Sequence, residues 1–302
     1  MADLDQLLKE TSRTFALAIP LLPEPYRREV TIAYLLFRIA DTFEDATHWA
    51  REERIAALER FVELLRARDR DGLVAATKQW LERSPSDHAG YLELLAETPA
   101  VYDALEAVRS EARVAIVHHT ARTALGMADV VRRADARGSL ALDDLEDLRH
   151  YCYLVAGIVG ELLTDLFVIP PSPAARVSRI LREHDVAFGE GLQLVNILKD
   201  ADDDAKEGRT YLPAGVARSE VLGLARADLE RARLYVLALQ AAKAEPGVVA
   251  FTALPVLLAR ATLDKLEVEG PGAKIPRSEV VELLFGLQGA LSRGEEAIPL
   301  KN

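Results

Sequence analysis

Apolar residues recur three and four positions apart over most of this chain, and that spacing predicts helix nearly throughout. Alanine, leucine, glutamate and arginine, which favour helix, dominate the sequence. Proline or glycine interrupts the pattern at residues 20–25, 84–86, 170–173, 213 and 246–247, where we expect breaks. The expected helices cover about 25–47, 50–68, 72–83, 98–135, 141–168, 173–206, 216–243, 247–267 and 277–293. No alternating pattern of useful length predicts a strand, so we expect an all-α fold in one domain, residues 1–302.

The composition supports a large buried core and limits the class of ligand. Of the 302 residues 50% are hydrophobic, and 37 Lys and Arg stand against 48 Asp and Glu, a net charge of −11. Nucleic acid is held mainly by surplus basic residues, so this balance argues against a nucleic-acid partner. A local basic cluster could still hold a small anion. The single cysteine, Cys152, excludes an intrachain disulfide, fits a reducing compartment and is expected in the core.

We expect neither a secretory signal at the N-terminus nor a membrane-spanning helix in the chain. The N-terminus is acidic and lacks the basic and apolar regions of a secretory signal. The longest apolar run, Gly247 to Ala259, contains Pro255 and is shorter than the ~18 residues expected of a spanning helix. We expect a cytoplasmic protein, with peripheral contact at the inner membrane surface as a second option. Nothing in the sequence indicates an obligate protein partner.

The first segment with candidate chemistry is Asp41-Thr-Phe-Glu44-Asp45. Residues four apart share one face of a helix, so the Asp41 and Asp45 carboxylates are expected side by side. The preceding stretch, 32–40, is apolar except for Tyr34 and Arg38, and Arg38 lies about one turn before Asp41. A surface helix end with an internal ion pair would show the same spacing.

The second segment is a polar stripe through an apolar helix. Its members, at spacings of three, four and four, are Gln193, Asn196, Asp200 and Asp204. Unpaired buried polar groups cost roughly 1–3 kcal/mol each, so the stripe needs partners. A hydrogen-bond network between helices is one solution, and a metal with its waters is the other. Two converging carboxylate pairs repel without a cation, so both segments together favour Mg²⁺, which takes one or two carboxylates plus phosphate oxygens.

Basic residues lie in or beside both acidic segments. They are Arg13, Arg38, Lys199 and Arg209. Guanidinium and ammonium groups suit diphosphate oxygens, and arginine binds them in a bidentate manner. Any one of these residues alone could be a solvated surface charge.

A third segment runs from Tyr151 to Gly160 and contains two glycines that weaken a helix, Gly157 and Gly160. They indicate close helix packing or room for a ligand, and an ordinary glycine-mediated helix crossing is the simpler interpretation. The expected apolar face of this helix comprises Val155, Val159 and Leu163. Tyr151 lies one turn before that face.

The order of these segments resembles the squalene/phytoene synthase family of head-to-head prenyl synthases. Five ordered motifs carry the resemblance, over about residues 12–259 with a weaker match near Lys274. They are Ser12-Arg-Thr-Phe15, Asp41-x-x-Glu44-Asp45, Tyr151-Cys-x-x-Val155-Ala-Gly-x-Val159-Gly160, Gln193-x-x-Asn196-Ile-x-x-Asp200-x-x-x-Asp204 and Gly208-Arg209-x-Tyr-Leu-Pro213.

The resemblance implies an all-α fold with a central cavity between the two acidic helices, in which two allylic diphosphates react with Mg²⁺. The implied metal ligands, catalytic aspartates included, are Asp41, Glu44, Asp45, Asn196, Asp200 and Asp204. The implied diphosphate contacts are Arg13, Arg38, Lys199 and Arg209. Tyr151 would serve the proton and cation step. The further substrate contacts we expect are Ser12, Phe15, Tyr34, Val155, Val159, Leu163 and Gln193.

The branch of the family is less sharply defined by the sequence. Phe251-Thr-Ala-Leu-Pro255 and Lys274-Ile275 resemble squalene synthases, and this implies NADPH bound through Lys274 and Arg277. However, Pro276 stands where that branch has a basic residue. We expect condensation of two farnesyl diphosphates through presqualene diphosphate, followed by reduction to squalene. Synthesis of presqualene diphosphate, dehydrosqualene or phytoene without reduction is the alternative, and a non-catalytic assembly protein is a more remote one.

Overall fold

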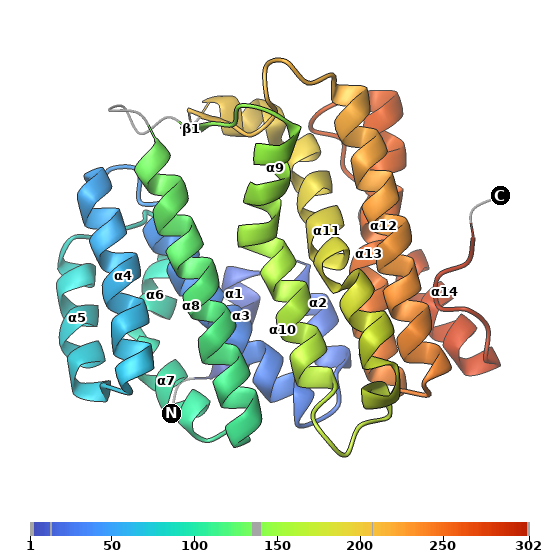
Figure 1. The fold of residues 1–302 in the computed structure, drawn as a ribbon, viewed down its shortest axis with the longest axis horizontal. Helices are drawn as coiled ribbons and strands as arrows, with labels where there is room; N and C mark the ends of the chain where they lie inside the picture. Colours follow the sequence, from blue (N-terminus) through green and yellow to red (C-terminus); the bar gives the residue numbers. More distant parts are fainter. Residues whose placement is uncertain (1–2, 13, 135–139, 207, 301–302) are drawn as a thin grey trace. The chain divides into compact units, whose positions relative to one another are not determined.

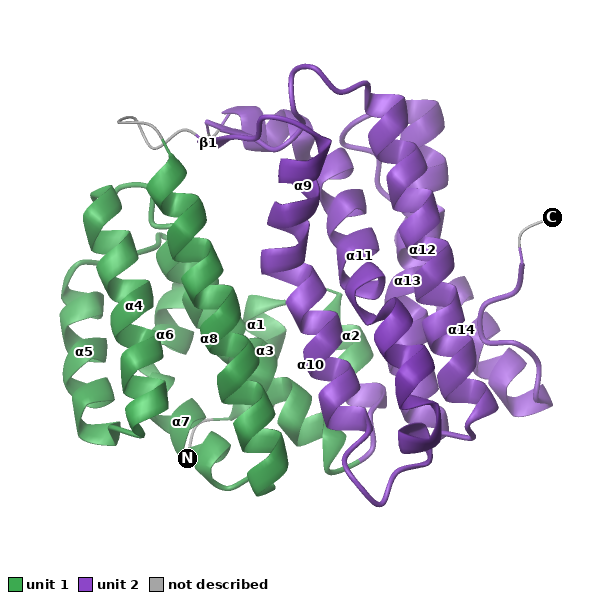
Figure 2. Ribbon diagram, in the orientation of Figure 1, with its two compact units in different colours: residues 1–19, 24–138 green, residues 20–23, 139–302 purple. Residues whose placement is uncertain are grey.

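The computed structural model describes residues 3–12, 14–134, 140–206 and 208–300, and it confirms the all-α class (Figure 1). In these residues the strands are limited to one short parallel pair, β1 (Leu140–Ala141) and β2 (Arg209–Thr210). The chain divides into two compact units (Figure 2). Unit 1 comprises residues 1–19 and 24–138, and unit 2 comprises residues 20–23 and 139–302. The expectation of a single domain stays a prediction.

The described residues of unit 1 form eight α-helices. They are α1 (Leu4–Thr11), α2 (Phe15–Ala18), α3 (Tyr26–Glu44), α4 (Arg51–Ala67), α5 (Arg70–Glu82), α6 (Ala89–Ala96), α7 (Thr98–Glu106) and α8 (Ser110–Arg133). The long α3 packs against α4 and α8 and is buried along most of its length. Three of these helices, α1, α2 and α6, lie outside the helices expected from the sequence.

An aromatic cluster holds the C-terminal end of α3, the end that carries the first acid pair. Phe43 is fully buried, and its ring lies 4.6 Å from that of Trp80, 6.1 Å from Phe61 and 6.2 Å from Trp49. Such aromatic pairs contribute about 0.5–1.5 kcal/mol each beyond the burial of their area. Phe43 lies between Asp41 and Asp45, so the packing of its ring holds the backbone that carries both aspartates.

The single helix expected over 98–135 is wrong, because α7 and α8 are separate. Arg109 precedes α8 with an extended backbone, φ −52° and ψ 142°. Its Nε and Nη2 atoms each donate to the Glu29 carboxylate at 2.7 Å, and Glu29 is only 1% exposed. A buried carboxylate needs a paired cation, so this contact between distant residues outweighs the local helical pattern.

Unit 2 contains the remaining helices, together with a 3₁₀ turn and a π turn. The α-helices are α9 (Leu145–Cys152), α10 (Ile158–Phe167), α11 (Ser178–Lys206), α12 (Arg218–Ala241), α13 (Pro246–Glu269) and α14 (Arg277–Arg293). The helix expected over 173–206 begins with the 3₁₀ turn, Pro173–Val177, before α11. Cys152 is buried as expected, and burial raises the pKa of its thiol.

The segment from α9 to α10 crosses α11 at glycines. This agrees with the simpler interpretation of Gly157 and Gly160, an ordinary glycine-mediated helix crossing. A Cβ atom on Gly160 would lie 1.8 Å from the Asp185 backbone oxygen, and one on Gly189 would lie 1.9 Å from that of Ala156. Only glycine permits this approach of two backbones. Between α9 and α10 the residues Tyr153–Gly157 form the π turn, so the helix expected over 141–168 is not α-helical throughout.

Helix α13 has the length and apolar composition to cross a membrane, although no uninterrupted apolar run in the sequence reaches that length. It is the one such helix in the part of the chain that the structure describes. Of its most apolar window, 72% is buried inside the protein. That burial is typical of a core helix, and α13 continues through Pro255 without a break.

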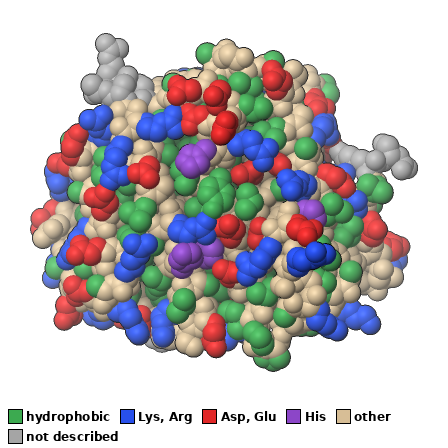
Figure 3. Space-filling model, viewed as in Figure 1, with side chains coloured by type: hydrophobic (Ala, Val, Ile, Leu, Met, Phe, Trp, Pro, Cys, Tyr) green, Lys and Arg blue, Asp and Glu red, His purple; other side chains and the backbone are tan. Residues whose placement is uncertain are grey.

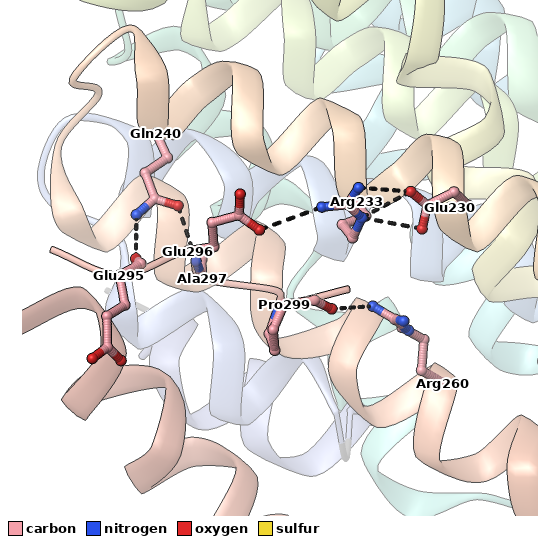
Figure 4. A network of polar contacts seen from close by, with 8 residues as sticks. All are labelled: Glu230, Arg233, Gln240, Arg260, Glu295, Glu296, Ala297 and Pro299. Atoms are coloured by element: carbon pink, nitrogen blue, oxygen red, sulfur yellow. Dashed lines mark hydrogen bonds and ion pairs between the residues drawn. The ribbon is translucent and has the colours of Figure 1, made fainter. Parts of the chain in front are cut away.

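The segment after α14 lies against α12 and α13 (Figure 4). The Gln240 amide donates to the Glu295 carbonyl at 2.6 Å and accepts from the Ala297 amide at 2.9 Å. Arg233 pairs with Glu296 at 3.5 Å, and Ile298 is fully buried. This segment therefore forms part of the packing of unit 2.

Candidate active site

The first acid pair lies at the C-terminal end of α3, in unit 1. An Arg38 Nη1 atom lies 3.2 Å from a carboxylate oxygen of Asp41, so the ion pair that the sequence left open is present. Burial raises the pKa of Asp41 to about 6, against the lowering effect of Arg38, and Asp45 raises it further. The two carboxylates thus repel each other despite Arg38, and a divalent cation bound to both would relieve that repulsion.

Arg38 lies among residues of α3 and of the Ser12-Arg-Thr-Phe15 motif. Its Nη2 donates to the Tyr34 hydroxyl at 3.2 Å, and that hydroxyl donates to the Thr11 carbonyl at 2.9 Å. The Tyr34 ring lies 5.6 Å from the Phe15 ring, and the Ser12 hydroxyl accepts from the Phe15 amide at 3.1 Å. The structure thus brings four of the expected substrate contacts together, whereas Arg13 lies outside the described residues.

The polar stripe lies on α11, in unit 2. Its residues are exposed or partly exposed, while the intervening Leu194, Val195, Ile197 and Leu198 are buried. The Lys199 ammonium lies 3.2 Å from an Asp200 carboxylate oxygen and donates to the Asn196 side-chain oxygen at 3.4 Å. The expected amide, cation and carboxylate are therefore neighbours on one accessible face.

The strand pair carries Arg209 to the C-terminal end of α11. β2 pairs with β1 in parallel, with Leu140 opposite Arg209. An Arg209 Nη2 atom lies 3.7 Å from an Asp204 carboxylate oxygen, and both side chains are only about one-fifth exposed. Each aspartate of the α11 stripe therefore has a cation beside it.

Tyr151 has a partner that the sequence analysis did not select. Its side chain is buried, and its ring stacks on that of Tyr211 with centroids 4.7 Å apart and planes 25° apart. Tyr211 is two residues beyond Arg209, inside the motif that we had used only for its arginine. Its place in that motif was the available signal.

The apolar residues expected beside Tyr151 follow a different helical geometry from the one assumed. Val155 lies in the π turn, so its four-residue spacing from Tyr151 does not follow an α-helix. Val159 and Leu163 lie in α10 and keep that relation to each other. Gln193 is partly exposed on α11.

The loop before α14 brings Lys274 toward the C-terminal end of α11. The Gly272 amide donates to the Lys199 carbonyl at 2.8 Å. Lys206 lowers the pKa of Asp203, and Lys274 adds a smaller effect in the same direction. Arg277 is the exposed first residue of α14.

The donor atoms of both units fit Mg²⁺ in kind, because all are carboxylate or amide oxygens. Among the described residues no three His, Cys, Asp or Glu side chains are grouped closely enough to hold an ion by themselves.

The described residues also form a cavity that lies apart from these candidate site residues. A cavity of about 460 Å³ lies at α13 and α14, where Leu257, Arg260 and Leu283 line it, and it includes none of the expected site residues. On the face drawn in Figure 3, acidic and basic side chains of the described residues are intermixed, without a continuous basic patch.

The fold is that of isoprenoid synthases of the squalene synthase type, and comparison with known proteins places the chain in a family. The sequence profile of the squalene/phytoene synthase family matches residues 8–228. The chain belongs to the squalene/phytoene synthase family.

Curated relatives share about three in ten of their aligned residues with this chain. A squalene synthase of Botryococcus braunii is 31% identical over 67% of this chain and 40% of its own length. Squalene synthase ERG9 of Candida albicans is 30% identical over 69% of this chain and 44% of its own. The aligned region thus spans less than half the length of these relatives.

Solved structures share the fold over nearly the whole chain. TcSQS in complex with the ligand BPH1237 aligns with a TM-score of 0.75 and 25% identity, covering 96% of this chain and 88% of its own. Squalene synthase HpnC of Alicyclobacillus acidocaldarius aligns with a TM-score of 0.54 and 18% identity, which bears on the fold alone.

Proposed function

We propose that this protein condenses two farnesyl diphosphates head to head, with Mg²⁺, to presqualene diphosphate and then reduces that intermediate with NADPH to squalene. The observation that carries the proposal is the placement of a cation 3.2–3.7 Å from an aspartate at three places, Arg38 at Asp41, Lys199 at Asp200 and Arg209 at Asp204. Membership in the family supports the same chemistry.

In this proposal the acidic residues hold the metal and the basic residues hold the leaving group. Asp41 and Asp45 on α3, with Glu44 assisting, and Asn196, Asp200 and Asp204 on α11 would be the ligands. Bound Mg²⁺ supplies Lewis-acid stabilisation of the charge that develops on the departing diphosphate. Arg38, Lys199 and Arg209 would move from carboxylate to phosphate oxygens, because a diphosphate carries more negative charge than one carboxylate.

Tyr151 would then act on the hydrocarbon part of the reaction. The double bond of the second substrate attacks the allylic cation, and loss of one proton closes the cyclopropane ring. A tyrosine hydroxyl can pass that proton on, and its ring face stabilises positive charge. The stack on Tyr211 fixes the plane of the Tyr151 ring.

The metal assignment is tested by replacing one aspartate in each unit. Asp41→Asn and Asp200→Asn each remove one negative charge while keeping size, and we expect turnover to fall by at least about 10²-fold with the helical content intact. Asp202→Asn is the control, because Asp202 is an exposed acid of α11 outside the stripe. Wild-type turnover by either Asp41→Asn or Asp200→Asn would remove the metal assignment.

One feature of the sequence bears on the proposed reduction by NADPH. Pro276, which stands where a basic residue is expected, begins the approach to α14 with no side-chain charge for a cofactor phosphate. This favours the alternative in which the reaction stops at presqualene diphosphate or continues to dehydrosqualene without NADPH. Mutation of Lys274 and Arg277 to Ala separates the two, because only the NADPH-dependent step should weaken.

A further inference from the structure

Arg38 lies over two tyrosine rings, and one of them belongs to a helix that the sequence analysis did not expect. Its guanidinium carbon is 5.7 Å from the centre of the Tyr34 ring and 5.4 Å from that of Tyr91. Tyr91 is the third residue of α6. Both distances lie within the ~6 Å range in which a cation is attracted to a ring face.

Tyr91 is itself held in place on its other contacts. Its ring stacks on that of His88, with centroids 4.2 Å apart and planes 29° apart. The helix that carries it approaches α1 closely, since a Cβ atom on Gly90 would lie 3.0 Å from the Glu10 carbonyl oxygen. The ring position is therefore fixed by the packing of α6 in unit 1.

The polar contacts of Arg38 within the described part of the chain leave one donor of its guanidinium unpaired. Nη1 faces Asp41, and Nη2 donates to the Tyr34 hydroxyl. Nε is buried and has no hydrogen-bond partner among the described residues. A planar guanidinium binds phosphate oxygens through the N–H groups along its edge, so the orientation of its plane decides which donors a ligand meets.

We propose that Tyr91, backed by His88, is a positioning residue that sets the plane of the Arg38 guanidinium for a diphosphate group. The inference rests on the proposed function, in which Arg38 holds diphosphate. Tyr91 acts only through Arg38 and needs no contact with the substrate.

The size of the effect follows from the strength of a cation–π contact. Loss of one such contact corresponds to a change of about 2- to 30-fold in an equilibrium constant, depending on how dry the site is. Tyr91→Leu removes the ring, whereas Tyr91→Phe keeps it. We therefore expect Tyr91→Leu to weaken the binding of inorganic pyrophosphate with Mg²⁺ by about 2- to 30-fold, and Tyr91→Phe to change it by less than about 2-fold.

The test is a double-mutant cycle with Arg38, read by calorimetry of pyrophosphate binding and by kcat and KM for farnesyl diphosphate. In the Arg38→Gln background, Tyr91→Leu should have no further effect, because the group it positions is gone. Tyr26→Leu is the matched control, since the Tyr26 ring lies under another guanidinium, that of Arg109, at 5.5 Å. It should leave pyrophosphate binding unchanged.

Each outcome decides the question. Wild-type binding by Tyr91→Leu, or an equal loss with and without Arg38, would overturn the positioning role. If Tyr91→Leu does not fold, Tyr91→Met fills the space without a ring and is judged by the same criteria. If the wild-type protein itself neither binds pyrophosphate nor turns over farnesyl diphosphate, the proposed function fails first.

Discussion

A methyl group added at Gly160 provides a sharp test of how the helices of unit 2 meet. The Cβ atom of Gly160→Ala would lie 1.8 Å from the Asp185 backbone oxygen and 2.7 Å from the carbonyl carbon. Both are backbone atoms of α11, so no side chain can turn away to relieve the overlap. The two helices have to separate along their glycine-mediated crossing.

The expected loss follows from two opposing effects. Alanine is better than glycine inside a helix by about 0.5–1 kcal/mol, which favours the variant. Overpacking of a tight core typically costs about 1–3 kcal/mol, and a backbone clash lies at the upper end. The difference is a net loss of about 2–2.5 kcal/mol, which lowers the melting temperature by about 4–10 °C for a unit of this size.

Gly223→Ala is the matched control for this experiment. Gly223 also lies in a helix, α12, but a Cβ atom there would meet nothing within 4 Å. The same substitution should therefore raise the melting temperature by about 1–4 °C. Both variants are unfolded by heating, and circular dichroism at 222 nm monitors the loss of helix. A melting temperature of Gly160→Ala equal to or above the wild-type value would refute the close crossing.

Three further predictions concern separate parts of unit 2. Tyr211→Leu removes the ring stacked on Tyr151, so kcat should fall by about 3- to 10-fold, whereas Tyr211→Phe should stay near wild type in a steady-state assay. Burial raises the pKa of Glu190 from its ordinary value of 4.5 to about 7. The stability that the protonated Glu190 side chain contributes is therefore fully present below pH 4.5 and is lost as the pH rises through 7. Glutamine does not titrate, so the melting temperature of Glu190→Gln minus that of the wild type should increase from pH 5 to pH 8. A difference that stays constant over this range would contradict the prediction. Ile298 is fully buried, so Ile298→Ala opens a cavity and should cost about 2–5 kcal/mol in urea unfolding, while Leu300→Ala, at a position 66% exposed, should cost nothing measurable.

The sequence predicted several helices closely from their apolar period. The expected span 277–293 coincides with α14, and the expected spans for α4 and α13 differ by one or two residues at each end. It missed α6, a helix of only 8 residues that contains Gly90. It also missed the break before α8, because the cause is the pairing of Arg109 with the distant Glu29.

The candidate site was predictable where chemistry and spacing coincide. The aspartates of α11 and the basic residues beside them were found because a polar stripe on an apolar helix is unusual. The contacts made by rings were not found, since a tyrosine such as Tyr91 or Tyr211 carries no periodic signal that distinguishes stacking from ordinary packing. The π turn was also invisible, because Tyr153–Gly157 has the same apolar pattern as an α-helix.

The most direct test of the proposed function is product analysis by mass spectrometry after incubation of the purified protein with farnesyl diphosphate and Mg²⁺, with and without NADPH. We expect squalene only when NADPH is present, and presqualene diphosphate when it is withheld. Presqualene diphosphate or dehydrosqualene regardless of NADPH would contradict the reductive step and leave the condensation. If neither farnesyl diphosphate nor its C20 homologue gives a product, the proposed function as a whole is contradicted.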